Sequence, residues 1–165
     1  MILFCVLINF IFGVGDFRQI PLSDDWRSEQ PTAKELEAFL KHHKIDVVIR
    51  MNVDRENGGL LYAKEKAICK KYGVELKYIN AHKGYEKGKG YLSSAAEIYQ
   101  ILNKKRCLIH CKHGFDRTGA MVGYYLSKKG YKKNQIIAHN YWKNYLKIKG
   151  NSYKPYYETA LYNAR

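Results

Sequence analysis

The order of apolar and polar positions along the chain predicts helices and strands in alternation. Apolar residues at helical spacing after Pro31-Thr32 predict a helix that ends near His43. Ile45–Asn52 is apolar and β-branched at its centre, which is typical of a strand covered on both faces. The same patterns predict further helices over 60–72, 93–102, 117–129 and 134–148 and from Pro155 onward, and further strands over 74–80 and 106–110. This alternation indicates a single α/β domain with a mainly parallel central sheet of about four to five strands, flanked by helices.

Two segments between these elements are expected to be irregular. Trp26–Gln30 is polar and turn-like, and Ala81–Tyr91 is a loop rich in glycine and lysine. Ser93 and Ser94 follow this loop directly, and their hydroxyl groups are suited to cap the helix that runs to Leu102.

The first 15 residues differ in composition from the rest of the chain. Ile2–Val14 is apolar, and Gly13-Val14-Gly15 has the small residues of a cleavage site, but no Lys or Arg precedes the apolar run. Residues 1–15 are therefore either a signal peptide or a first strand, and residues 16–165 form the domain. The first alternative predicts an exported, periplasmic protein and the second a cytoplasmic one. The apolar run is too short for an integral membrane span to be expected.

The chain has a formal net charge of +14, which is spread along its length rather than confined to a tail. A surface this basic concentrates polyanions such as phosphoproteins, anionic lipids or nucleic acid, although charge alone names no partner. Hydrophobic residues make up 46% of the chain, which argues against intrinsic disorder. Four cysteines are too few for a disulfide-stapled fold, so at least one free thiol is expected.

The stretch IHCKHGFDRTGAMVG, Ile109–Gly123, places reactive side chains between the last predicted strand and the helix after it. Open α/β sheets bind ligands at this edge, where the strands end. The loop amides, the helix N-terminus and the planar guanidinium of Arg117 together suit a tetrahedral oxyanion such as phosphate. The loop residues expected to bind it are Lys112, His113, Gly114, Phe115 and Arg117.

Cys111 lies in the same positive field. A cysteine at a helix N-terminus beside an arginine has a lowered pKa and is a nucleophile near neutral pH. Cys111 is therefore expected to attack phosphorus, and water would hydrolyse the resulting phosphocysteine, with no metal or cofactor. Thr118 is expected to hydrogen-bond the sulfur as it leaves, and His110 to orient the loop through backbone hydrogen bonds.

The segment His110-Cys111-(KHGFD)-Arg117-Thr118 resembles the signature of the cysteine-dependent protein-tyrosine and dual-specificity phosphatases. Trp26–Asn52 also looks like the opening "YRS-x-QP…L…GIKTVINL" segment of the small bacterial and atypical members. The resemblance covers most of Asp16–Lys149. It implies a dual-specificity-phosphatase-like fold, with Cys111 as nucleophile, Arg117 as phosphate ligand and Thr118 as the hydroxyl.

The general acid does not follow from this resemblance. In that family it is an Asp on the loop that corresponds here to Asn80–Tyr91, and this loop contains no Asp. Three candidate acids stay open, Asp116, Glu86 and His82, besides a reaction that needs no acid. Asp116 resembles a displaced acid in the C-x4-D-R loops of the myotubularin phosphatases. Lys83, Lys87 and Lys89 are expected at the pocket rim, where they would contact a polyanionic substrate.

Other readings of the motif remain. HC-x-HG-x-x-RTG, from His110 to Gly119, also resembles the loop of the metal-independent RNA 5′-triphosphatases. The substrate is thus a phosphorylated protein, or alternatively a 5′-triphosphorylated RNA or a phosphoinositide. A phosphate-binding module without turnover is the alternative of another class. A zinc cluster of Cys107, His110, Cys111 and His113 is disfavoured because no second ligand pair has the usual spacing and Arg117 would repel a cation.

Overall fold

A computed structural model describes residues 16–54, 60–81, 91–140 and 154–162. In this part of the chain, five strands form one sheet in the order β1-β2-β5-β3-β4. Only the β1–β2 pair is antiparallel. The strands are β1 (Arg18–Gln19), β2 (Trp26–Ser28), β3 (Val47–Arg50), β4 (Glu75–Tyr78) and β5 (Cys107–His110). The expected α/β fold with a mainly parallel sheet is confirmed.

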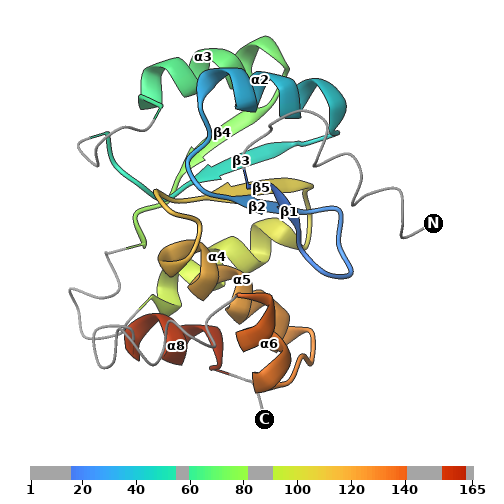
Figure 1. The fold of residues 1–165 in the computed structure, drawn as a ribbon, viewed down its shortest axis with the longest axis vertical. Helices are drawn as coiled ribbons and strands as arrows, with labels where there is room; N and C mark the ends of the chain where they lie inside the picture. The colour runs from blue at the N-terminus through green and yellow to red at the C-terminus, as the bar shows by residue number, and fades with distance from the viewer. Residues whose placement is uncertain (1–15, 55–59, 82–90, 141–153, 163–165) are drawn as a thin grey trace.

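Helices cover both faces of this sheet, as Figure 1 shows. In the described ranges, the helices on one face are α2 (Ala33–His42) and α3 (Tyr62–Lys71). The helices on the other face are α4 (Leu92–Leu102), α5 (Asp116–Lys128), α6 (Lys133–His139) and α8 (Lys154–Ala160). The sheet thus separates two apolar clusters, one around Leu36, Phe39 and Val48 and the other around Ile49, Ile109 and Met121.

Local sequence explains where α2 begins. The Thr32 hydroxyl accepts a hydrogen bond from the Glu35 amide, and the Glu35 carboxylate accepts one from the Thr32 amide. This reciprocal capping box satisfies two amide groups that the helix cannot pair internally. Leu36, Phe39 and Leu40 then face the core, as the apolar spacing predicts.

Two expectations about local structure are wrong. Trp26–Ser28 is a strand rather than part of a turn, and it pairs in parallel with β5. Ser93 and Ser94 do not cap α4, which begins at Leu92. The Ser94 hydroxyl instead donates to the Asn80 carbonyl and ties α4 to the segment after β4.

Helix α8 packs along α5 in the same direction. Gly123 of α5 lies against Ala160, and the Tyr124 ring stacks on that of Tyr162 with centroids 6.3 Å apart. The start of α8 therefore lies beside the start of α5. The predicted helix over 134–148 is described as α6 up to His139, with Asn140 as its C-cap, and residues 141–148 lie outside the described residues.

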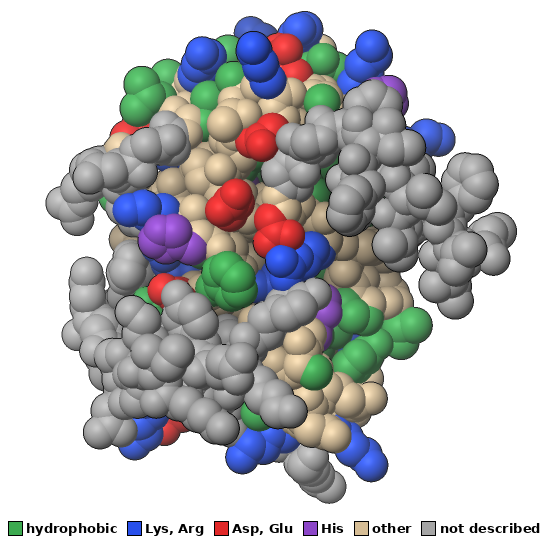
Figure 2. Space-filling view, viewed as in Figure 1, with side chains coloured by type: hydrophobic (Ala, Val, Ile, Leu, Met, Phe, Trp, Pro, Cys, Tyr) green, Lys and Arg blue, Asp and Glu red, His purple; other side chains and the backbone are tan. Residues whose placement is uncertain are grey.

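No helix in the described ranges is long and apolar enough to cross a membrane. Residues 1–15, for which a signal peptide or a first strand is predicted, lie outside those ranges. Basic side chains are scattered over both helical layers on the face seen in Figure 2, rather than gathered in one patch.

Candidate active site

The reactive motif lies where β5 ends and α5 begins. β5 is flanked by β2 and β3, and all three run in parallel, so their carboxyl ends meet at this edge. Cys111 directly follows the last residue of β5, and Asp116 is the first residue of α5. Residues 111–115 thus form a short loop between a buried strand and a helix N-terminus, where the helix dipole favours an anion.

Backbone carbonyls at the start of this loop and along it accept hydrogen bonds from neighbouring segments. Each of three alternate carbonyls accepts a hydrogen bond from another part of the chain. The pairs are His110 with the Met51 amide at 3.1 Å, Lys112 with the Gln30 amide at 3.2 Å, and Gly114 with Arg27 Nη2 at 2.6 Å. A trans peptide points its N–H opposite to its carbonyl, so the amides of residues 111, 113 and 115 face away from these partners. This arrangement suits an anion-binding loop.

Gly114 allows the loop to lie against the segment after β2. It has a φ of 67°, a conformation that side chains rarely adopt. A Cβ atom here would lie 2.7 Å from the Glu29 nitrogen and 2.8 Å from the Ser28 carbonyl carbon and oxygen. Only glycine fits this position without a shift of backbone.

Cys111 and Arg117 occupy buried positions at this loop. The exposed fraction of Cys111 is 2% and that of Arg117 is 8%. Arg117 Nη1 donates to the Met51 carbonyl at 2.8 Å, and this bond restricts the orientation of the guanidinium. Burial raises the pKa of the Cys69 and Cys107 thiols to about 12, so neither is ionised near neutral pH. These two cysteines are core residues.

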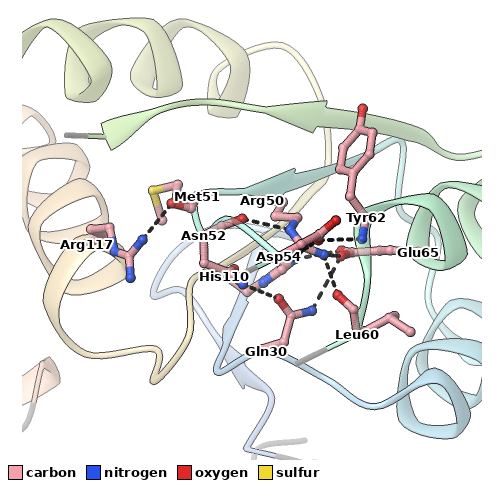
Figure 3. A network of polar contacts seen from close by, with 10 residues as sticks. All are labelled: Gln30, Arg50, Met51, Asn52, Asp54, Leu60, Tyr62, Glu65, His110 and Arg117. Carbon is pink, nitrogen blue, oxygen red and sulfur yellow. Dashed lines mark hydrogen bonds and ion pairs between the residues drawn. The ribbon is translucent and has the colours of Figure 1, made fainter. Parts of the chain in front are cut away.

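The His110 ring is held by a charged network that the sequence did not predict (Figure 3). Its Nε2 lies 2.7 Å from Glu65 Oε1, and Arg50 Nη1 lies 2.6 Å from Glu65 Oε2. All three side chains are at most 1% exposed. Burial would raise the pKa of the Glu65 carboxyl, but the charges and hydrogen bonds of His110 and Arg50 outweigh burial and lower it. The His110 carbonyl, rather than its ring, accepts a backbone hydrogen bond, which the Met51 amide donates.

Tyr156 of α8 lies beside the same loop. Its ring stacks on that of Tyr91 with centroids 4.7 Å apart. Asp116, Arg117 and Cys111 lie close enough to affect the pKa of its phenol electrostatically. Burial raises the pKa of the Tyr156 phenol, which a hydrogen bond with Tyr91 partly offsets. Tyr156 is therefore a protonated hydroxyl beside the loop near neutral pH.

A family model described as the tyrosine phosphatase family matches residues 14–153. The chain belongs to the tyrosine phosphatase family. No curated protein matches it significantly by sequence. Helix α8 and Tyr156 lie beyond the residues that the family model matches.

Solved structures share the fold of this phosphatase. A protein from Shewanella putrefaciens CN-32, assigned as a phosphatase, has a TM-score of 0.66 at 19% identity, over 93% of this chain and 96% of its own. The core of Siw14 from S. cerevisiae has a TM-score of 0.57 at 18% identity, over 90% and 78%. TpbA from P. aeruginosa has a TM-score of 0.56 at 20% identity, over 77% and 73%.

The structure brings some of the other predicted residues of this phosphatase to the loop. His113 is exposed, whereas Lys112, Phe115 and Asp116 are half-buried. Thr118 is buried, and within the described part of the chain its hydroxyl has no hydrogen-bond partner. His82, Lys83, Glu86, Lys87 and Lys89 lie outside the described residues.

Among the described residues, no group of three or more His, Cys, Asp or Glu side chains could hold a metal ion. The sequence reasoning also missed Arg27, Arg50, Glu65 and Tyr156. One signal was present for Glu65, which precedes the buried Ile68 and Cys69 by one helical turn and therefore shares their apolar face.

Proposed function

We propose that this phosphatase hydrolyses phosphomonoesters, with phosphotyrosine as the first substrate to test, through a phosphocysteine on Cys111. The observation that carries the proposal is the loop itself. Cys111 lies on a loop with outward-bonded carbonyls, next to an anchored arginine and a helix N-terminus. These groups stabilise negative charge on phosphate oxygens without a metal.

In the first step, the Cys111 thiolate attacks phosphorus and the ester P–O bond breaks. The leaving oxygen keeps the electron pair of that bond and takes a proton. Loop amides and Arg117 stabilise the charge on the equatorial oxygens of the phosphoryl group. In the second step, water attacks phosphorus, the S–P bond breaks and inorganic phosphate leaves, which regenerates the thiolate with help from the Thr118 hydroxyl.

Asp116 is the acid candidate that the described residues support. It is half-buried at the start of α5, next to Arg117 and close to Tyr156. If Asp116 protonates the leaving group, Asp116→Asn slows phenyl phosphate much more than p-nitrophenyl phosphate, whose leaving group needs no proton. Equal slowing of both substrates would transfer the role to Glu86 or His82.

The test of the mechanism compares wild type with Cys111→Ser in the presence of EDTA. Substrates are p-nitrophenyl phosphate, a phosphotyrosine peptide, a phosphoinositide and a triphosphorylated RNA. Phosphate release that survives chelation and disappears in Cys111→Ser supports the thiol mechanism and ranks the substrates. Phosphate binding without release from any substrate would favour the binding-only alternative.

A phosphoanhydride is the second candidate substrate. The relative Siw14 is described as a PP-IP phosphatase, whereas a variant of TpbA has been solved with phosphotyrosine. The loop 80–91 has no Asp, and a phosphate leaving group needs less protonation than an alkoxide. If Lys83, Lys87 and Lys89 select polyanions, neutralising all three raises KM for an inositol pyrophosphate far more than for p-nitrophenyl phosphate. Equal effects would reject that role.

A further inference from the structure

Glu65 connects His110, which precedes the proposed nucleophile Cys111, to Arg50. The carboxylate comes from α3, and it contacts His110 at the end of β5 and Arg50 at the end of β3 (Figure 3). Cys111 is the next residue after His110, and Met51 is the next after Arg50. One buried side chain thus joins the strand end that precedes Cys111 to the strand end that precedes the anchor of Arg117.

The chemistry of the carboxylate fixes the proton on His110. An ionised carboxylate only accepts hydrogen bonds, so the ring nitrogen that faces it, Nε2, must carry a proton. The Arg50 guanidinium occupies the other oxygen and cannot accept. Gln30 Nε2 also faces Glu65 Oε2, at 3.4 Å.

Arg50 extends this connection into the backbone after β3. Its Nε donates to the Asn52 carbonyl at 2.8 Å and its Nη1 to the Leu60 carbonyl at 2.6 Å. Its Nη2 lies 2.8 Å from Asp54, whose carboxylate also accepts from the Tyr62 amide at the start of α3. The turn that contains Met51 is therefore held from both sides.

We propose that Glu65 is a positioning residue of the active site, which holds the His110 ring with its proton on Nε2 and, through Arg50, the backbone that orients Arg117. This role rests on the proposed function. The loop amides that would bind phosphate are oriented by hydrogen bonds from the Gln30 backbone amide and the Arg27 guanidinium to the carbonyls of loop residues, rather than by the Glu65 carboxylate. Loss of the Glu65 carboxylate therefore misplaces the nucleophile more than it weakens phosphate binding.

Glu65→Gln tests the role with nearly the same side-chain shape. A carboxamide has one acceptor oxygen and one donor group, whereas Glu65 accepts from His110 on one oxygen and from Arg50 and Gln30 on the other. Arg50 can only donate and keeps the oxygen, so the amide faces His110, which must then accept through Nε2 and can carry a proton only on Nδ1. ¹⁵N NMR of the histidine rings, assigned with a His110→Gln sample, reads this change directly.

The expected kinetic result is a loss in kcat of about 10- to 100-fold on p-nitrophenyl phosphate, with KM changed less than about threefold, because a small misplacement of reacting groups slows the chemical step. Glu37→Gln is the matched control. It neutralises an exposed glutamate on α2 that lies 3.2 Å from Lys71 of the same α3, and neither readout should change.

The role is overturned if wild-type His110 lacks a proton on Nε2, or if Glu65→Gln changes neither the protonated nitrogen nor kcat. A fall in melting temperature with unchanged kcat would also overturn it. If Glu65→Gln does not fold, Glu65→Asp keeps the charge on a side chain shorter by one methylene group, and a partial loss of kcat is expected. The NMR measurement needs no turnover, so it decides on Glu65 even if the wild type hydrolyses no phosphate and the proposed function fails.

Discussion

Replacing Gly114 with alanine tests whether the loop must lie against the segment after β2. The backbone has a φ of 67°, which costs about 1–2 kcal/mol for a residue with a Cβ. The new methyl group would lie 2.7 Å from the Glu29 nitrogen, whereas ordinary carbon contacts are about 3.5–4.0 Å. Because the atoms it would meet are backbone atoms of the Ser28–Glu29 peptide, the loop must shift by about 1 Å, and a misplacement of this size lowers a rate by about 100-fold.

The assay is kcat/KM on p-nitrophenyl phosphate together with urea unfolding. Gly73→Ala is the control, since Gly73 has a φ of 69° but open space around its Cβ position. Gly73→Ala should lose about 1–2 kcal/mol of stability and Gly114→Ala at least as much, but only Gly114→Ala should lose activity. If Gly114→Ala stays within about threefold of wild type, close contact with Ser28 and Glu29 does not set the loop geometry.

Two further predictions concern stability and the α8 side of the site. Burial raises the pKa of Asp25 from 3.8 to about 6. The stability that comes from keeping this carboxyl protonated in the fold is therefore complete below pH 3.8 and is lost as the pH rises through 6. Asp25→Asn keeps an acceptor for the Cys107 amide and should raise the free energy of unfolding at pH 7 by up to about 3 kcal/mol, with little change at pH 3.5; equal effects in urea titrations at both pH values would contradict this. Tyr156→Phe keeps the stack on Tyr91 but removes the hydroxyl beside the loop, so kcat/KM should fall about tenfold. Tyr162→Phe, two residues beyond the end of the same helix and exposed, should match wild type; equal activities of the two variants would exclude Tyr156 from the site.

Elements with a local signal could be predicted from the sequence. The helix after Thr32 begins and ends where the apolar spacing and the cap indicate, and Ile45–Asn52 contains β3. The C-x5-R motif predicts Cys111 and Arg117 as site residues, and it lies between a strand and a helix, as the pattern predicts. These features depend on residues close together in the chain.

Elements stabilised by distant partners could not be predicted. β2 has the polar pattern of a turn because Arg27 and Ser28 are buried there, and Arg27 pairs with Gly114, 87 residues away. Glu65 looks like an ordinary helix residue until His110, 45 residues away, is placed beside it. Polar groups buried at an active site break the hydrophobic pattern because their partners come from elsewhere in the fold.

The position of β5 at the centre of the sheet has a consequence for folding. Arg27 bonds to Gly114 of the loop, 87 residues further along the chain, and Met51 bonds to Arg117 just after the loop, 66 residues further along. Contacts across such separations form slowly, because closing a long loop costs entropy before any contact is gained. A chain still emerging from the ribosome therefore cannot have completed the 111–115 loop. If the loop binds phosphate as proposed, recovery of that binding during refolding reports the joining of the two halves of the sheet.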